Sequence, residues 1–222
     1  MNRMRQSVHR GKRKSSSFGF AISVAFGASS PLYDGNGDRK YLTILERQAF
    51  LRAADKLPGP KRTFCRMLAY TGARLSEVLA LTTTRIDCGA GLVVFESLKK
   101  RRRGIFRAVP LPRSFFAELE GVHTLLRARG DAVGENKPLW FFGRTTGWKV
   151  VKTALSGAGI VGAQASPKGL RHAFAVSALQ AGVPLNLVRR WMGHSRLSTT
   201  AIYADAIGAE EQLLAARFWT TF

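Results

Sequence analysis

Three residues near the C-terminal end of the chain have side chains that suit chemistry on a phosphate ester. Arg171 offers a planar guanidinium group, which can neutralise two phosphate oxygens at once. His194 can donate a hydrogen bond or move a proton near neutral pH. Tyr203 carries a hydroxyl that is a nucleophile once a base removes its proton. These residue types together suit phosphate chemistry, with the tyrosine as a candidate nucleophile.

Two predicted helices must position these residues. Residues 173–179 form an amphipathic run that stops at Gly182. Pro184 stands where a second helix can begin, since proline is tolerated in the first helical turn. The second helix has an apolar face that includes Trp191, and Gly193 is placed to end it.

This stretch resembles the C-terminal signature of the tyrosine recombinase (phage-type integrase) family. The family carries the pattern H-x-L-R-H, then L-G-H, then a tyrosine nine residues after that histidine. The letters LRH at 170–172 and GH at 193–194 stand at the matching spacings, and residues 198–203 (STTAIY) resemble the family's S-T-T-x-x-Y run. The sequence departs from the pattern at one position, because Lys168 replaces the family's first histidine.

A second motif lies at residues 71–81, TGARLSEVLAL, and resembles the family's T-G-x-R-x-S-E-x-x-x-L box. In the family this box carries the first catalytic arginine, which matches Arg74 here. Gly72 lets the chain turn into a new helix, and Glu77 at i+3 can reach back to hold the Arg74 guanidinium. A lone R-x-x-E is more often a surface ion pair, but the C-terminal motif favours the catalytic role.

A β-hairpin with a cationic tip is predicted next. Residues 92–98 and 105–111 have the apolar character of strands, and Gly104 is a turn residue between them. In the family a hairpin here carries a lysine that protonates the departing 5′-oxygen. A lysine fits this role because its flexible ammonium can reach a leaving group and release a proton. Lys99 is the first candidate and Lys100 the second.

The remaining cations of the hairpin are predicted to bind DNA. Guanidinium groups stay charged, which makes them poor proton donors but good phosphate ligands. The alternative, that the whole tip provides only electrostatic attraction to the DNA backbone, stays open. The predicted DNA-binding residues are Lys100, Arg101, Arg102, Arg103 and Arg107.

The resemblance implies a reaction in which Tyr203 attacks a DNA phosphodiester and forms a 3′-phosphotyrosine. Arg74 and Arg171 would clamp the non-bridging oxygens, and His194 would donate a further hydrogen bond. The covalent link keeps the energy of the ester, so no ATP is required. The sequence has no Walker box and no carboxylate cluster for two magnesium ions, so neither a cofactor nor a metal is predicted.

Lys168 and His172 complete the predicted site. An ammonium group at Lys168 supplies positive charge, but it is a base only if its pKa is depressed, as burial beside two arginines could do. Our hypothesis is that Lys168 keeps the phosphate contact of the histidine it replaces. His172 is interpreted as a structural partner in the same helix, and Glu77 as the residue that orients Arg74.

Composition favours a polyanion as the partner. The 222 residues carry a formal net charge of +21 at pH 7, with a pI of about 11.3. Each phosphate that a protein cation neutralises releases counterions, so a nucleic acid suits this excess better than a small neutral substrate, and the resemblance implies that this partner is double-stranded DNA. A solvated basic surface or a ribosome-like binder is the alternative that composition alone leaves open.

Compartment signals agree with a cytoplasmic protein. Cys65 and Cys88 lack a C-x-x-C spacing, which indicates neither a zinc site nor a disulfide framework. No apolar run is long enough to span a bilayer, so no membrane partner is expected. Residues 18–28 follow a basic segment and faintly resemble a signal peptide, but the small residues among them weaken that interpretation.

The chain is predicted to hold one domain and an arm. Residues 1–40 are interpreted as a basic disordered arm and linker, and residues 41–222 as a DNA breaking-rejoining catalytic domain. The fold class is mainly α with a small antiparallel β-sheet (α+β), similar to tyrosine recombinase catalytic domains. The resemblance covers residues 42–218 only, and family members usually carry an additional N-terminal helical domain. A truncated relative therefore remains an alternative.

Local signals predict several helix ends. Thr43 and Glu46 have the spacing of a capping box. Ser166 precedes a proline that opens the helix of the L-R-H motif. A helix over 148–157 is expected with Trp148 in the core, and His123 is interpreted as structural. The chain would close with an amphipathic helix over 209–218, docked on its own domain or on a neighbouring protomer.

The resemblance also implies a homo-oligomer, a tetramer, on DNA. A type IB topoisomerase is the nearest alternative enzyme, since it uses similar chemistry without site preference. A catalytically idle DNA-binding protein is the alternative from another class, and the intact residue set argues against it.

Overall fold

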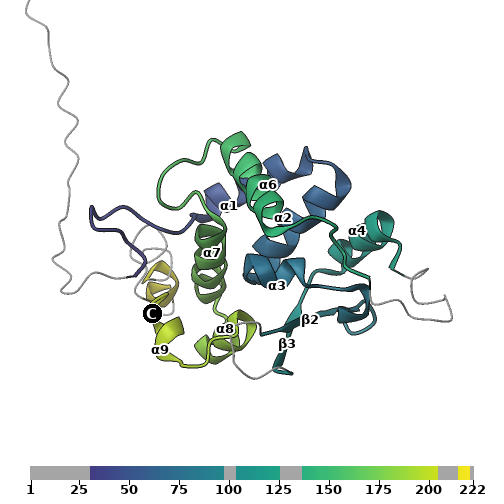
Figure 1. Ribbon diagram of the computed structural model, residues 1–222. Helices are drawn as coiled ribbons and strands as arrows, with labels where there is room; N and C mark the ends of the chain where they lie inside the picture. The colour runs from purple at the N-terminus through teal and green to yellow at the C-terminus, as the bar shows by residue number, and fades with distance from the viewer. Residues whose placement is uncertain (1–30, 98–103, 126–136, 205–214, 221–222) are drawn as a thin grey trace, which may run out of the picture.

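Helices make up most of the protein, and one small sheet lies at their side (Figure 1). This computed structural model describes residues 31–97, 104–125, 137–204 and 215–220. The prediction of a mainly α fold with a small antiparallel sheet is confirmed. Within those ranges, no helix combines the length and apolar character needed to cross a bilayer. The helices are α1 (Ile44–Asp55), α2 (Gly59–Thr71), α3 (Leu75–Leu79), the 3-10 turn η1 (Thr83–Arg85), α4 (Arg113–His123), α6 (Arg144–Gly157), α7 (Pro167–Gln180), α8 (Leu185–Met192) and α9 (Ser198–Ala201).

The sheet confirms the predicted hairpin. Strands β1 (Ile86–Asp87), β2 (Leu92–Glu96) and β3 (Phe106–Pro110) pair antiparallel in the order β1-β2-β3. Glu96 pairs with Phe106 at the end of the hairpin, so the basic segment joins the two strands there. Residues 98–103 themselves lie outside the described part of the chain.

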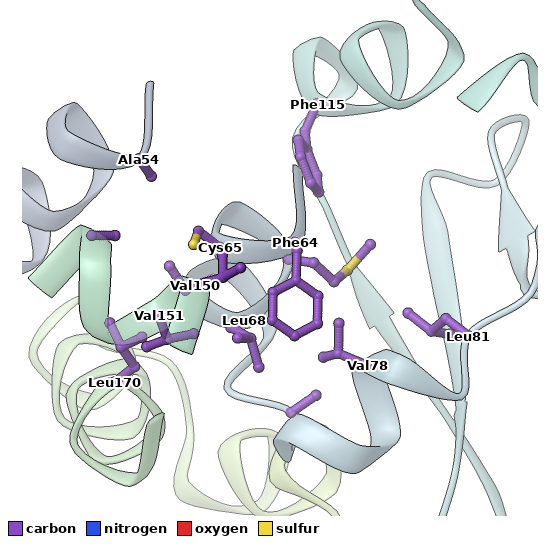
Figure 2. Packing of buried hydrophobic residues seen from close by; sticks show 14 of the residues in the cluster. Ala54, Phe64, Cys65, Leu68, Val78, Leu81, Phe115, Val150, Val151 and Leu170 are labelled. Atoms are coloured by element: carbon purple, nitrogen blue, oxygen red, sulfur yellow. The ribbon is translucent and has the colours of Figure 1, made fainter. Parts of the chain in front are cut away.

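The main core gathers side chains from α2, α3, α6 and α7 (Figure 2). Phe64 of α2 is fully buried, and its ring meets Trp140 edge-on with ring centroids 5.4 Å apart. Val78 from α3, Val151 from α6 and Leu170 from α7 belong to the same cluster. The helices that carry the motif residues are therefore fixed to one another by burial of their apolar faces.

The predicted helix ends are confirmed where the sequence carried a capping signal. Thr43 and Glu46 form the capping box of α1, with hydrogen bonds in both directions. The Ser166 hydroxyl accepts a hydrogen bond from the backbone of the first turn of α7. Gly72 and Gly193 follow α2 and α8 with φ of 59° and 68°, left-handed values that favour glycine.

Helix α6 differs from its prediction. It begins at Arg144 rather than near residue 148. Trp148, which we expected in the core, is 47% exposed. Gly147 occupies the inward position instead, where an added Cβ would lie 3.1 Å from the ring of Phe64. Because the next residue falls on a different face of the helix, Trp148 is turned toward solvent.

Residues 31–40 were predicted as part of a disordered linker, but the structure packs them on the domain. Leu32 and Tyr41 are buried in a second apolar cluster that also contains Tyr203. The Asp34 carboxylate accepts hydrogen bonds from two backbone amides of a tight turn, and the Lys40 amide donates to the Leu32 carbonyl at 2.7 Å. This turn folds the segment back onto the domain.

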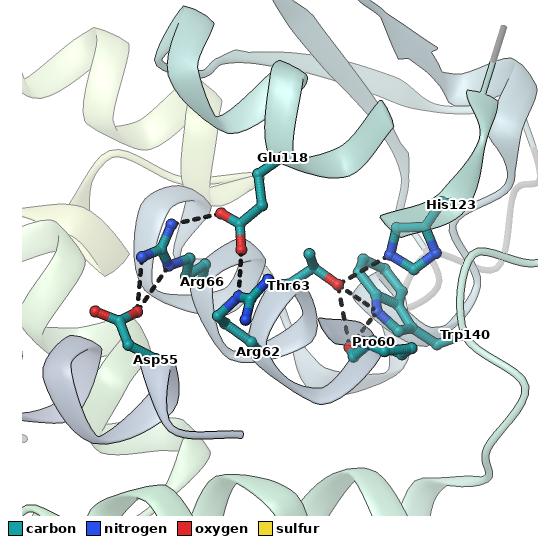
Figure 3. A network of polar contacts seen from close by, with 8 residues as sticks. All are labelled: Asp55, Pro60, Arg62, Thr63, Arg66, Glu118, His123 and Trp140. Carbon is teal, nitrogen blue, oxygen red and sulfur yellow. Dashed lines mark hydrogen bonds and ion pairs between the residues drawn. The ribbon is translucent and has the colours of Figure 1, made fainter. Parts of the chain in front are cut away.

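A network of ion pairs joins α1, α2 and α4 (Figure 3). Glu118 of α4 accepts a hydrogen bond from Arg62 at 2.7 Å and also pairs with Arg66. Arg66 in turn contacts Asp55 at 2.6 Å, at the end of α1. Arg62 and Arg66 are therefore paired with acidic residues of the same domain.

His123 has the structural role expected of it. Its Nε2 atom lies 2.9 Å from the Thr63 hydroxyl, and its ring meets Trp140 edge-on (Figure 3). The Trp140 indole donates a hydrogen bond to the Pro60 carbonyl at 2.9 Å. These contacts connect the end of α4 with the start of α2.

The predicted C-terminal helix is described only in part. Residues 215–219 are helical, and residues 209–214 lie outside the described ranges. Phe218 and Trp219 are both exposed, and their rings meet edge-on.

Two helical glycines give a matched test of the packing around α7. An added Cβ at Gly169 would lie 1.9 Å from the Gln164 carbonyl oxygen, whereas Gly121 in α4 has open space around that position. We predict that Gly169→Ala lowers the free energy of unfolding by about 1–3 kcal/mol, the usual range for overpacking. Gly121→Ala should raise it by roughly 0.5–1 kcal/mol through helix propensity. Urea denaturation followed by circular dichroism measures both, and equal stabilities of the two variants would contradict the packing described.

Candidate active site

The fold brings together residues from both motifs. Arg171 and His172 lie in α7, His194 follows α8, and Tyr203 follows α9. Arg74 is the residue just before α3. The following contacts join these elements into one site.

Glu77 is the acid of the site, and its carboxylate is buried at 2% exposure. Oε1 accepts a hydrogen bond from Arg74 Nη1 at 2.8 Å, as the R-x-x-E spacing predicted. Oε2 accepts from Arg107 Nη2 at 2.6 Å and from the Arg74 backbone amide at 2.9 Å. Burial alone would raise the pKa of Glu77, but the hydrogen bonds and charges of Arg107 and then Arg74 outweigh it, so the pKa is lowered. The carboxylate therefore stays ionised.

Arg171 is held between two helix ends. Its Nη1 donates to the Gly72 carbonyl at 2.5 Å and its Nη2 to the Met192 carbonyl at 2.6 Å. Carbonyls at a helix C-terminus lack partners within the helix and carry partial negative charge, so they suit a cation. Burial, with the charge of Arg74, lowers the pKa of Arg171 to about 10. Arg171 is still charged at neutral pH.

His194 is neutral in this arrangement. Its Nε2 lies 3.0 Å from Arg171 Nη2, and because arginine can only donate, Nε2 is the acceptor. Nδ1 therefore carries the proton and donates to the Thr200 hydroxyl at 2.9 Å. Burial, and then the charges of Arg171 and Arg74, lower the pKa of His194 to about 4. This state differs from the donor role that we expected of His194 toward a phosphate, since Nε2 is occupied as an acceptor.

Tyr203 lies inside the site at 4% exposure. Its hydroxyl is 3.0 Å from His172 Nδ1, and its ring is nearly parallel to that of His194, with centroids 6.1 Å apart. Burial raises the pKa of the Tyr203 hydroxyl, although the charges of Arg171 and Arg74 oppose the shift. In this state the tyrosine is a neutral phenol.

His172 is the residue that sequence reasoning underrated. The motif placed it in the helix beside Arg171, but only the structure pairs it with the Tyr203 hydroxyl. Burial, followed by the charges of Lys168 and Arg171, lowers the pKa of His172 to about 4. A neutral imidazole at this position can accept a hydrogen bond from the phenol and hold it in place.

Other predicted residues lie differently from the expectation. Lys168 is in the first turn of α7 with an exposed side chain, so the burial considered for it is not found. Arg107 was predicted to bind DNA, but it is only 8% exposed and its guanidinium points at Glu77 and the Trp191 carbonyl. In this conformation the Arg107 guanidinium is paired within the domain and is not an open surface cation. The hairpin residues Lys99, Lys100, Arg101, Arg102 and Arg103 lie outside the described part of the chain.

The electrostatics of the site favour an anion. Arg74 and Arg107 pair with the carboxylate of Glu77, Arg171 has only backbone carbonyls and a histidine as described partners, and both histidines are neutral. The cluster therefore has excess positive charge in a partly desolvated setting, where donors act more strongly than in water. Such a site can stabilise a phosphoryl group that gains negative charge as it is attacked.

The fold is that of tyrosine recombinase catalytic domains. The structure resembles that of XerA recombinase with a TM-score of 0.67 and 24% identity, over 80% of this chain and 64% of that one. It resembles the catalytic domain of bacteriophage HP1 integrase with a TM-score of 0.57 and 22% identity, over 76% of this chain and 88% of that one.

Residues 40–209 match the phage integrase family, and the chain belongs to that family. The tyrosine recombinase XerD of Pseudomonas aeruginosa is 35% identical over 190 residues, which is 80% of this chain and 61% of that protein. XerA of Pyrococcus furiosus is 28% identical over 170 residues, which is 74% of this chain and 56% of that protein. The chain thus spans between half and two thirds of the length of these relatives.

The neutral histidines make stability depend on pH. The pKa of His172 is about 4 in the folded protein, below its usual value of 6.5, so the unfolded state binds more protons between these values. We predict that the free energy of unfolding is highest above pH 6.5 and falls as pH decreases toward 4. A His172→Gln variant should have a shallower slope in urea denaturation across this window. An unchanged slope would show that His172 is not held neutral.

Proposed function

We propose that this chain is the catalytic domain of a site-specific recombinase that breaks and rejoins DNA through Tyr203. The observation that carries the proposal is the convergence of Tyr203 with His172, Arg171 and His194 in one cationic site. The membership of the phage integrase family supports the same conclusion.

In the proposed reaction the Tyr203 oxygen attacks a phosphodiester phosphorus. The phenol gives up its proton to the neutral imidazole of His172, whose Nδ1 lies 3.0 Å from the hydroxyl, while a bond forms from the phenolic oxygen to phosphorus and the bond to the 5′-oxygen breaks. The product is a 3′-phosphotyrosine and a free 5′-hydroxyl, whose proton comes from Lys99 or Lys100. Attack by the freed 5′-hydroxyl on the phosphotyrosine reverses these steps and rejoins a strand.

The two motif arginines would bind the non-bridging oxygens of the phosphate. Arg74 is held by Glu77, and Arg171 by two backbone carbonyls, so both are oriented before DNA arrives. Preorganised donors of this kind each contribute roughly 2.7–4 kcal/mol to catalysis. Lys168, exposed at the start of α7, would add a phosphate contact. Tyr203 is buried here, so DNA binding must bring its hydroxyl and a phosphate into contact.

The partner that we propose is double-stranded DNA, bound by a homo-oligomer, a tetramer, in the cytoplasm. The net charge of +21 supports a polyanionic partner. The XerH recombinase, whose complex with palindromic difH substrate matches this fold with a TM-score of 0.65, is a DNA-bound protein of the same fold. The proposal needs neither metal nor ATP, because the phosphotyrosine conserves the energy of the broken ester.

The decisive experiment is a search for a covalent protein–DNA adduct. The protein is incubated with nicked and supercoiled DNA that carries candidate sites from its own genomic flanks, and products are resolved under denaturing conditions. We predict an adduct with the wild type and none with Tyr203→Phe, since only the hydroxyl is removed.

Other outcomes would point to the alternatives. Relaxation of supercoils without site preference would indicate a topoisomerase. Tight, salt-sensitive DNA binding with no adduct would indicate an idle or truncated DNA-binding relative. Either result would contradict the proposed recombinase.

Lys168 provides a separate test of the substituted motif position. We predict that Lys168→Ala slows adduct formation by about tenfold or more, since charged donors at a reacting phosphate have effects of that order. Lys56→Ala, which removes an exposed lysine at the end of α1, is the matched control and should cleave at the wild-type rate. Full cleavage by Lys168→Ala would eliminate the phosphate-contact hypothesis.

A further inference from the structure

Arg107 is a buried cation that the proposed reaction leaves without a role. It lies in β3, and its guanidinium lies over the ring of Phe95, 4.9 Å from the centroid. Its Nη2 donates to Glu77 Oε2 at 2.6 Å and its Nε to the Trp191 carbonyl at 2.7 Å. A buried charge is unfavourable unless it is paired and hydrogen-bonded, so these two contacts determine where the side chain lies.

Arg107 affects the orientation of Arg74, because both arginines bind the carboxylate of Glu77. The Glu77 side chain is fully buried, so water cannot take the place of a missing partner at either oxygen. With Arg107 on Oε2, Glu77 presents Oε1 to Arg74. Without Arg107, only the Arg74 backbone amide holds Oε2, and the carboxylate can turn to pair with the Arg74 guanidinium through both oxygens, since a bidentate pair is the preferred arrangement. That rotation would draw the Arg74 guanidinium away from a bound phosphate.

The contact with the Trp191 carbonyl fixes the other side of the site. Trp191 and Met192 end α8, and their carbonyls accept hydrogen bonds from Arg107 and Arg171 respectively. Gly193 packs closely on the Arg107 side chain. A Cβ added at Gly193 would lie only 3.1 Å from Arg107 Nη1. His194 is the next residue, so Arg107 links β3 to the turn that presents this histidine.

We propose that Arg107 is a positioning residue for the proposed cleavage reaction. It orients Glu77, and through it Arg74, while the Trp191 carbonyl holds the Arg107 guanidinium in place for this contact. The inference rests on the proposed function, since Arg74 is taken as a ligand of the scissile phosphate. It replaces the expectation that Arg107 itself contacts DNA.

The test compares single-turnover cleavage of a nicked DNA site by the full chain and its variants. Arg107→Met keeps the length of the side chain and removes its hydrogen bonds, and we expect cleavage about 10- to 100-fold slower, the usual loss when a supporting contact to a reacting group is removed. Arg107→Lys can pair with Glu77 but cannot reach both partners with one ammonium, so an intermediate rate is expected. Arg85→Met is the matched control, since the Arg85 guanidinium at the end of η1 lies over the ring of Phe106 in β3, whereas the ion pairs of Glu77 among the described residues are with Arg74 and Arg107.

A double-mutant cycle separates positioning from a structural effect. If Arg107 acts through Arg74, then Arg107→Met combined with Arg74→Ala cleaves no more slowly than Arg74→Ala alone. Rate losses that multiply, or cleavage by Arg107→Met at the wild-type rate, would overturn the inference. Thermal melts confirm that each variant is folded at the assay temperature, and Arg107→Lys carries the test if Arg107→Met does not fold.

DNA affinity provides an independent readout. A positioning residue leaves affinity and its salt dependence unchanged, whereas a direct phosphate contact lowers the salt slope by about 1 when it is removed. A reduced slope for Arg107→Met would therefore overturn the inference in favour of direct binding. Failure of the proposed function is distinguishable, because in that case the wild type forms no adduct. Failure of this inference leaves the wild-type adduct intact.

Discussion

The site depends on one buried carboxylate shared by two arginines. Glu77 receives Arg74 from the loop before α3 and Arg107 from β3, and both contacts are shorter than 3 Å. Removal of one partner from a buried pair typically costs about 3–5 kcal/mol, because the remaining charge stays desolvated. Glu77 thus connects the helical part of the domain to its sheet and sets the direction in which Arg74 points.

Helix ends supply the other fixed points. Carbonyls at the C-terminal ends of α2 and α8 have no partners within their helices. Arg171 donates hydrogen bonds to the carbonyls of Gly72 and Met192, and Arg107 donates to the carbonyl of Trp191. Glycines follow both helices, and their left-handed conformations turn the chain sharply at these points. The arginines are therefore oriented by backbone atoms, which vary less in position than flexible side chains.

Burial, together with the surplus of positive charge in the site, explains why its two histidines are neutral. Buried imidazoles beside arginines are held neutral, as the pKa values of about 4 for His172 and His194 indicate. Neutral histidines can accept hydrogen bonds, one from Arg171 and one from the Tyr203 phenol. The same surplus favours an incoming phosphate, so the charge that shapes the resting site is also the charge that a DNA substrate would neutralise.

Features that depend on neighbours along the chain could be predicted from the sequence alone. The capping box at Thr43, the glycine after α8 and the hairpin strands follow from local hydrogen bonds and backbone freedom. Motif spacing predicted that Arg74, Arg171 and Tyr203 belong to one site, but the packing of the helices and the sheet sets which distant groups are in contact.

Three findings depended on such distant contacts. Arg107 lies in a hairpin rich in cations, which suggested that it binds DNA. Its guanidinium instead pairs with Glu77, thirty residues away along the chain. His172 meets Tyr203 only because α7 packs against the segment after α9, and Leu32 joins the core because a turn folds it back. Contacts between residues far apart in sequence depend on how helices pack, and the pattern of a single sequence does not encode that packing locally.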